Sequence, residues 1–239
     1  GGAGGDTVSY ALAIEELTRI DSSVAITVAA HTSLGTMPIY LFGSEEQKQR
    51  WLPDLASGAK LAAFGLTEPG AGSDAGATRT TAKLRNGQWI VNGSKVFITH
   101  AGVGEIFVAT ARTEPGKGNK GITSFILTKE TCDLERCRAV GVGHEDGLPR
   151  VKGFRAGKKE DKMGWRASDT RERVFEDAVV PKENLLGSPG HGFINFLKTL
   201  DAGRIGIAAL SLGIAEGAYE EALRYAGVRK QFGKAIGSF

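Results

Sequence analysis

The stretch FGLTEPGAGSD, residues 64–74, decides how the rest of the chain is interpreted. It follows a short β-type run, and its small residues let the backbone approach a planar or anionic ligand closely. Thr67 and Ser73 offer hydroxyl groups, and Glu68 and Asp74 could cap the loop. An ordinary Gly- and Pro-rich turn is an equally open interpretation of this loop taken alone. The stretch is neither a Walker loop nor a Rossmann fingerprint.

Helices are predicted on the N-terminal side of this loop. Residues 6–23 carry apolar side chains at helical spacing, and Asp21-Ser22-Ser23 caps a second, mostly apolar helix from Val24 to about Leu34. A third helix begins with the capping-box pattern of residues 44–47 and ends near Ser57-Gly58. We therefore expect an N-terminal helical domain over residues 1–60.

The region after Lys60 reads as a β domain, residues 61–187. Asn86-Gly87 and Asn92-Gly93 predict tight turns between strands, and the spacing is typical of a small barrel or sandwich. Arg171–Val180 adds a strand with an exit turn at residues 181–184. The other predicted strands are Leu61–Leu66, Thr78–Leu84, Trp89–Val91, Lys95–Thr99, Ile106–Arg112 and Ile122–Leu127.

Helical spacing returns in residues 188–239. His191–Arg229 is predicted as one long helix with a kink near Asp201–Gly203, and its Ala and Gly residues predict close packing against neighbouring helices. The fold class is thus α+β and multidomain, with N-terminal helices, a central β-barrel domain and the start of a C-terminal helical bundle.

Composition narrows the function. The chain has 239 residues, 24% charged and 41% hydrophobic, with a net charge of +3 and charges mixed in sign. The composition is typical of a globular protein, and the mild positive charge suits an anionic small-molecule ligand. A nucleic-acid-binding surface is not expected, because Lys and Arg do not form a block. We expect no membrane span, since no apolar run approaches about 20 residues, and no signal peptide. Two cysteines argue against a disulfide framework. Both chain ends predict a fragment that lacks segments on either side.

Several motifs in order resemble the acyl-CoA dehydrogenase family. Residues 64–74 resemble its signature almost residue for residue, and SKVFIT at 94–99 resembles its flavin-contacting strand, with Phe97 where Trp is usual. The resemblance continues in KEDKMGWR at 159–166, VFED at 174–177 and VPK at 180–182, and ends with LDAGR at 200–204 and RKQFG at 229–233. The texture is most like short-chain, butyryl-type members.

The resemblance implies a role for each matching residue. Thr67 and Thr99 would bond the flavin edge, Phe97 would pack on its ring, and Ser73 would lie near CoA. The FAD-binding residues it implies are Phe64, Leu66, Thr67, Gly72, Ser73, Phe97, Ile98, Thr99, Arg229 and Phe232, the last two toward a neighbouring subunit. The residues it implies for acyl-CoA are Ser73, Asp201, Gly203 and Arg204.

The implied reaction is FAD-dependent α,β-dehydrogenation of an acyl-CoA thioester to the trans-2-enoyl-CoA, with electrons passed to an electron-transfer flavoprotein. Most of the family has its base, a Glu, in a segment beyond Phe239, and a minority has it at the position of Gly203. This chain is therefore expected to contain no catalytic base and to be inactive by itself. A homo-oligomer, a tetramer by resemblance, in the bacterial cytoplasm or mitochondrial matrix is also implied.

Alternatives remain open for single residues and for the whole. Asp201 and Arg204 could be a surface ion pair, and Arg229 a partner of the helix dipole. An acyl-CoA oxidase-type branch or a non-catalytic FAD- or CoA-binding fragment would share the motifs. Residues 132–152 are an insertion relative to the family; its cysteines and His144 match zinc spacing poorly, so no metal is expected.

Overall fold

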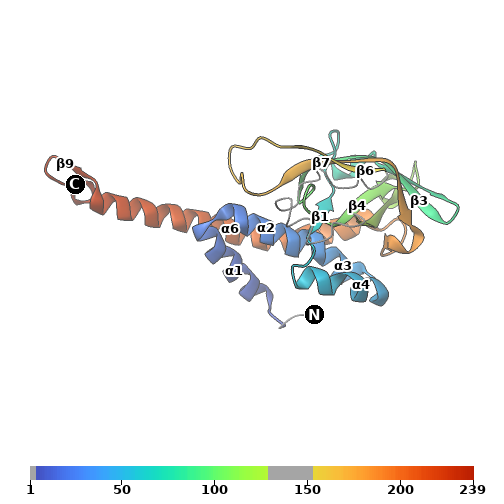
Figure 1. Ribbon diagram of the computed structural model, residues 1–239, viewed down its shortest axis with the longest axis horizontal. Coiled ribbons are helices and arrows are strands. Elements are labelled where there is room, and N and C mark those ends of the chain that lie inside the picture. The colour runs from blue at the N-terminus through green and yellow to red at the C-terminus, as the bar shows by residue number, and fades with distance from the viewer. Residues whose placement is uncertain (1–3, 129–152) are drawn as a thin grey trace.

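The computed structural model describes residues 4–128 and 153–239. The predicted insertion at 132–152 and its cysteines lie outside these residues. The N-terminal helices and the β domain form one end of an elongated molecule, and a single long helix extends from it toward the C-terminus (Figure 1).

The N-terminal region is helical because its caps satisfy the free backbone groups at each helix start. Asp6 accepts from Ser9 N before α1 (Thr7–Ile20), and Asp21 accepts from two amides at the start of α2 (Ser22–Ala29). The chain continues through a π-helical segment, η1 (Ala30–Thr36), into α3 (Met37–Phe42), and then α4 (Glu45–Ala56). The predicted capping box of Ser44 and Gln47 is present in α4.

Within the described residues, one helical stretch, Ser22–Phe42, is long and apolar enough to cross a membrane by length and composition alone. The expectation that no apolar run approaches this length was therefore wrong. The stretch packs on β1 and α6, and its Ala25, Ala29 and Ile39 are only 0%, 2% and 0% exposed. Core helices of soluble proteins meet the same test, so the finding is weak evidence for a membrane span.

In the part of the chain that the structure describes, the central β domain is one mixed sheet of eight strands. Its hydrogen-bonded order is β6-β7-β3-β2-β4-β5-β8, and β1 pairs in parallel with β4. The first four strands are β1 (Ala62–Gly65), β2 (Thr81–Arg85), β3 (Gln88–Thr99) and β4 (Ile106–Arg112). The others are β5 (Ile122–Thr128), β6 (Phe154–Lys159), β7 (Thr170–Pro181) and β8 (Leu185–Leu186), with short 3-10 turns η2 (Ala75–Ala77), η3 (Gly118–Gly121) and η4 (Lys182–Asn184).

The two predicted Asn-Gly turns have different outcomes. Asn86-Gly87 joins β2 to β3 with φ of 49° and 77°, as a tight hairpin requires. Asn92-Gly93 is not a turn: it is a bulge inside β3, where the register against β7 shifts between Val91 and Gly93. Asn92 holds the strand through hydrogen bonds of 2.8 and 3.0 Å with Asp177.

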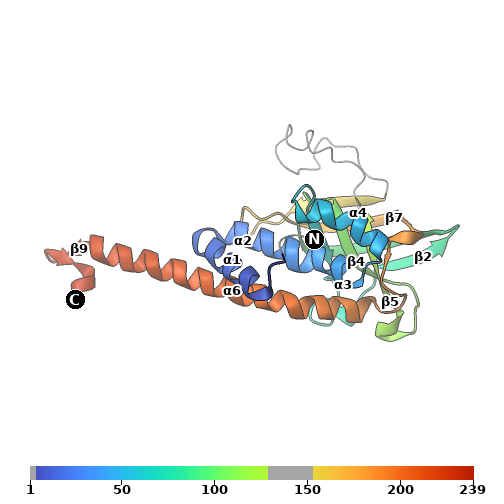
Figure 2. The same ribbon diagram turned by 90° about the horizontal axis from the view of Figure 1, so that it is seen from below.

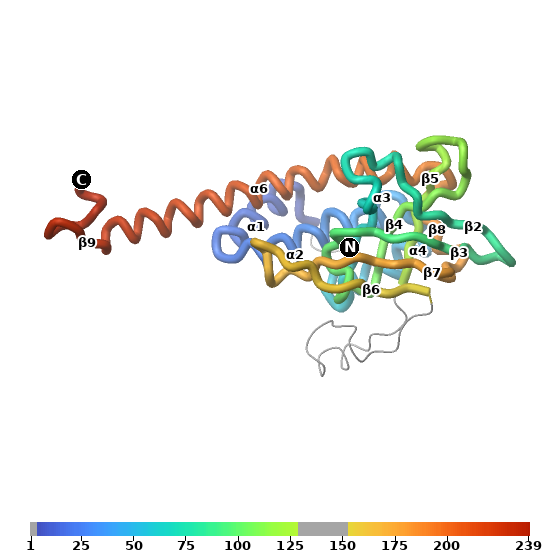
Figure 3. Tube along the Cα trace, turned by 90° about the horizontal axis from the view of Figure 1, so that it is seen from above, coloured from blue at the N-terminus to red at the C-terminus, as the bar shows by residue number. Residues whose placement is uncertain are grey.

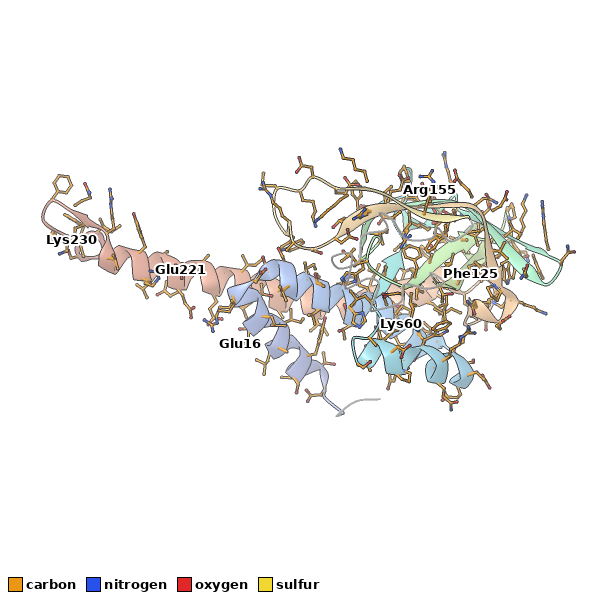
Figure 4. All side chains as sticks on the ribbon, in the orientation of Figure 1. Glu16, Lys60, Phe125, Arg155, Glu221 and Lys230 are labelled. Atoms are coloured by element: carbon orange, nitrogen blue, oxygen red, sulfur yellow. The ribbon has the colours of Figure 1, made fainter. Side chains whose placement is uncertain are left out.

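The sheet separates two hydrophobic clusters. Alternate residues of the strands face opposite sides, so Ile106 and Val108 pack toward the helices while Phe107 packs into the other cluster. The helix-facing cluster includes Trp51 of α4 and Phe196 of the long C-terminal helix. Phe125 lies inside the sheet domain, as its labelled side chain shows (Figure 4).

The C-terminal region is one helix, α6 (Gly192–Val228), of 37 residues. It runs through Asp201–Gly203 as a continuous helix and passes beside α2 and α3 and one side of the sheet (Figure 2). The predicted close packing is present, because a Cβ at Gly213 or Gly217 would lie 2.3 or 2.4 Å from a carbonyl oxygen of α1.

The distal part of α6 carries exposed apolar side chains, among them Leu212, Tyr219, Leu223 and Val228 at 55–67% exposed. Glu221 on this part of α6 and Lys230 just beyond the helix both lie far from the sheet domain (Figure 4). A hairpin of β9 (Lys230–Gln231) and β10 (Lys234–Ala235), followed by η5 (Ile236–Ser238), folds back on the helix end.

Candidate functional site

Three segments that are distant in sequence meet at a cavity of about 420 Å³. They are the loop after β1, the end of β3 and the first part of α6, with η1 closing one side. Figure 3 shows β3 and β7 side by side, as their antiparallel pairing requires. The cavity is lined by Ala30, Leu34, Ala63, Phe64, Leu66, Thr67, Gly72, Ser73, Ala75, Phe97, Ile98, Thr99, Leu197, Leu200 and Arg204.

Nine of the residues assigned to ligands by sequence line this one cavity. They are Phe64, Leu66, Thr67, Gly72, Ser73, Phe97, Ile98, Thr99 and Arg204. Of this lining in the described chain, Arg204 is the one charged residue and none is a carboxylate. The cavity thus combines apolar walls, three hydroxyl groups and one cation, which suits an aromatic or anionic ligand.

The loop after β1 is fixed by its own backbone and by β3. Glu68 and Ala71 exchange two backbone hydrogen bonds of 3.0 Å, and Val96 N donates to Thr67 O at 2.9 Å. At Gly65, the last residue of β1, a Cβ would lie 2.5 Å from the Phe107 ring, so this position has no room for a side chain. The loop backbone therefore reaches the cavity in a defined shape.

Glu68 has the capping role that the sequence suggested, but it is buried. Its carboxylate accepts from the amides of Arg79 and Thr80 at 2.6 and 3.1 Å, so it closes the 68–80 loop. It also accepts from Lys95 Nζ at 2.7 Å, and the two side chains are 5% and 0% exposed. Lys95 has no individual role in the site predicted from the sequence, although two-residue alternation along β3 places it on the same inward face as Val91.

Glu68 and Lys95 each change the pKa of the other. Burial alone would raise the pKa of Glu68, but the charge of Lys95 and the hydrogen bonds to the carboxylate lower it. Burial lowers the pKa of Lys95 from 10.5 to about 8, against the opposing effect of Glu68. Both groups are thus charged at neutral pH, and the ion pair persists within the sheet.

The end of β3 presents an aromatic ring to the cavity. Phe97 has φ of 57° and is 67% exposed, an unfavourable backbone and exposure for a residue of this kind. The register against β7 shifts between Lys95 and Ile98, and this bulge leaves Ile98 buried while Phe97 points outward. A strained, exposed aromatic residue at a cavity is typical of a ligand contact.

Helix α6 forms one wall of the cavity, and Gly203 lies outside the lining. Arg204 pairs with Asp201 one turn away, and both side chains are largely exposed. Asp201 does not line the cavity. Gly203 is buried against Leu34, and a Cβ there would lie 3.0 Å from Leu34 Cδ2. Leu34 itself lines the cavity, which places Gly203 behind this wall.

Arg229 and Phe232 lie at the far end of α6. A helix rises about 1.5 Å per residue, so Arg229 lies roughly 37 Å along the axis from Arg204. Phe232 is 92% exposed, at a turn with φ of 51°. These two residues are therefore outside the cavity of their own chain.

Acidic residues on α6 are already paired or exposed. Glu220 pairs with Arg19 of α1 at 2.8 Å, Glu221 pairs with Arg224, and Glu216 is exposed. These placements agree with the expectation that the three are solvated or packing residues. The described residues contain no cluster of three or more His, Cys, Asp or Glu that could hold a metal ion.

Three family models match this chain in succession. The N-terminal domain of acyl-CoA dehydrogenase matches residues 1–59, the middle domain residues 63–178 and the C-terminal domain residues 190–239. The chain belongs to the acyl-CoA dehydrogenase family. The family resemblance seen in the motifs is thereby confirmed, as is the predicted order of helices, β domain and C-terminal helix.

Relatives in the family match over nearly all of this chain. A short-chain specific acyl-CoA dehydrogenase of Clostridium acetobutylicum is 48% identical over 100% of the chain and 58% of its own length. The CarC subunit of the caffeyl-CoA reductase-Etf complex of Acetobacterium woodii is 42% identical over 100% and 58%. The chain therefore spans little more than half the length of these relatives.

A solved family structure has the same fold. The acyl-CoA dehydrogenase of Bacillus anthracis complexed with FAD has a TM-score of 0.86 and 39% identity, and the match covers 100% of this chain and 38% of that one. The cavity residues that the sequence did not predict are all apolar and lie on η1, β1, η2 and α6; they are Ala30, Leu34, Ala63, Ala75, Leu197 and Leu200. Only the tertiary fold brings them together, so no local sequence signal identifies them.

Proposed function

We propose that this chain forms the FAD- and thioester-binding part of a dehydrogenase that converts a short-chain acyl-CoA to the trans-2-enoyl-CoA. The observation that carries the proposal is the convergence of nine motif residues on one cavity. The name of the Clostridium relative supports short-chain substrates, and the FAD complex of the Bacillus relative supports the cofactor.

The residues of the cavity fit a flavin. Thr67 and Thr99 provide hydroxyl groups, the 64–73 backbone provides a close approach, and Phe97 provides a face on which an aromatic ring can pack. Bound FAD would supply the acceptor for the hydride from the substrate β-carbon. Ser73 and Arg204 would hold the CoA portion, with Arg204 suited to phosphate.

The proton transfer needs a group that the cavity lacks. Removal of the α-proton requires a carboxylate in a dry site, with hydrogen bonds that polarise the thioester carbonyl. No carboxylate lines the cavity in the described chain, and Gly203 cannot serve as a base. By family resemblance, we propose that the base is a Glu in a segment that follows position 239 in longer relatives.

The proposed assembly follows from the family as well. We propose a homo-oligomer, a tetramer by resemblance, in which Arg229 and Phe232 reach the FAD of a neighbouring subunit. The exposed position of Phe232 supports this role. An electron-transfer flavoprotein is the proposed acceptor, supported by the name of the CarC relative. The bacterial cytoplasm or mitochondrial matrix remains the proposed location.

The test is to add FAD and then butyryl-CoA to the 239-residue chain without oxygen. We expect FAD to bind, measured by its fluorescence, and its absorbance to persist after butyryl-CoA is added. Failure to bind FAD would contradict the proposed cofactor. Bleaching of the flavin by this chain alone would contradict the missing base. Rapid reoxidation of chemically reduced flavin by oxygen would favour the oxidase-type branch.

A further inference from the structure

Lys95 is a charged side chain within the sheet, 0% exposed, with no place in the proposed chemistry. Its Nζ donates to Glu68 Oε1 at 2.7 Å, to Leu66 O at 3.3 Å and to Thr110 Oγ1 of β4 at 3.2 Å. Two of these acceptors belong to the loop that lines the cavity. The ammonium group therefore connects β3 and β4 to the backbone of the loop.

Stability alone does not account for this ion pair. Taking two charges out of water has a cost that their attraction repays only in part, and apolar replacements of such pairs are often neutral or stabilising. The neighbouring inward positions Val91 and Ile98 show that the same strand buries apolar side chains readily. A buried Lys at this point therefore suggests a requirement for its geometry.

The contacts indicate what that geometry fixes. Leu66 and Thr67 both line the cavity, and Lys95 holds the carbonyl oxygen of Leu66 while Val96 N holds that of Thr67. Glu68, held by Lys95, fixes the other end of the loop through Arg79 N and Thr80 N. The ion pair thus sets the orientation of consecutive peptide groups at the cavity wall.

Resting on the proposed function, we propose that Lys95 and Glu68 are positioning residues for FAD. Their ion pair holds the 66–68 backbone in the orientation that the cofactor requires, so FAD affinity depends on the pair beyond its effect on folding. Neither side chain lines the cavity, so neither would touch FAD bound there.

A double variant that removes both buried charges distinguishes an effect on FAD positioning from an effect on folding. Lys95→Met and Glu68→Gln each leave one buried group without its partner, so each should lower Tm. The double variant Lys95→Met/Glu68→Gln removes both charges and should recover most of the Tm. We expect FAD binding by the double variant to remain about tenfold or more weaker than that of the unchanged chain, the size of a lost charged hydrogen bond.

Gln47→Leu is the matched control. Gln47 is buried and holds the backbone of another loop, donating to Glu183 O at 2.7 Å and Leu185 O at 2.8 Å, away from the cavity. This variant should lower Tm and leave FAD affinity within about threefold of the unchanged chain. A tenfold loss of FAD affinity in Gln47→Leu would assign the effect to general loosening and overturn the proposal.

A second measurement uses the unchanged chain, so its outcome does not depend on whether a variant folds. Glu68 is the charged group that faces Lys95, while Thr110 and Thr78 contribute neutral hydroxyls. The FAD dissociation constant of the unchanged chain should rise about tenfold from about pH 7 to 9.5 as Lys95 loses its proton. A constant value across this range, or a double variant that binds FAD as well as the unchanged chain, would overturn the proposal. An unchanged chain that binds no FAD would instead refute the proposed function, and this inference with it.

Discussion

The imidazole of His31 accepts a hydrogen bond at Nδ1 from the backbone N–H of Ala62, at 3.1 Å. Its Nε2 then carries the proton donated to Leu55 O at 2.9 Å, so the ring is neutral. His100, directly after β3, contacts the same residue of β1: its Nδ1 lies 2.9 Å from Ala62 O. Two neutral histidines thus anchor β1, next to the cavity, to η1, α4 and the end of β3.

This arrangement predicts that stability falls in mild acid. Burial lowers the pKa of both His31 and His100, and for His100 the nearby His31 lowers it further while Asp169 opposes this. Below the unfolded value of about 6.5, the unfolded chain binds more protons, so the free energy of unfolding falls as pH falls. Urea midpoints between about pH 5 and 8 test this.

His31→Gln should reduce this pH dependence, because it removes one of the two groups. The control is His191→Gln, since His191 is exposed at the start of α6. Equal pH slopes for the unchanged chain and His31→Gln would show that His31 does not contribute.

A Cβ at position 213 should separate α1 from α6. It would lie 2.3 Å from Glu15 O, a backbone atom that cannot rotate away. Gly213→Ala should therefore lower the free energy of unfolding by about 1–3 kcal/mol, as overpacking does. Gly227→Ala on the same helix meets nothing within 4 Å and should be neutral or stabilise by up to about 1 kcal/mol. Equal effects of the two substitutions in chemical denaturation would contradict the close packing.

Phe97→Gly should raise stability and weaken FAD binding together. A glycine adopts φ of 57° without the cost of about 1 kcal/mol or more that a left-handed Phe carries. Loss of the ring should reduce FAD affinity about tenfold if it packs on the flavin. Asn86→Gly, at φ of 49° in the β2–β3 turn, is the control that should leave FAD affinity unchanged. A Phe97→Gly variant with full FAD affinity would remove Phe97 from the proposed site.

Arg204→Ala should weaken CoA-thioester binding with little effect on Tm. Its partner Asp201 is exposed, and exposed ion pairs contribute little to stability. Loss of the cation at the cavity should raise the dissociation constant for butyryl-CoA about tenfold, with the loss smaller at high salt. Arg224→Ala is the matched control, since Arg224 forms the same i,i+3 pair with Glu221 away from the cavity. Equal affinities of the two variants in calorimetry would argue against a CoA contact at Arg204.

The sequence by itself determined the features that depend on near neighbours. Asp6, Asp21 and Ser44 cap helices because their oxygens reach amides two or three residues away. Asn86-Gly87 forms a hairpin because its positive φ values are local. The ordered motifs, from the 64–74 loop to α6, also identified the family and most of the residues that line the cavity.

Only the tertiary structure decided which partners distant residues meet. Asn92-Gly93 has the composition of a turn, but its pairing with Asp177 on β7 keeps it inside a strand. In the sequence, Lys95 is one more charged residue of a predicted strand, and only the tertiary fold buries it against Glu68. Local preferences amount to about 1 kcal/mol per residue, and burial and pairing with distant strands can outweigh them. The cavity exists because such long-range pairings hold η1, the 64–74 loop, β3 and α6 together.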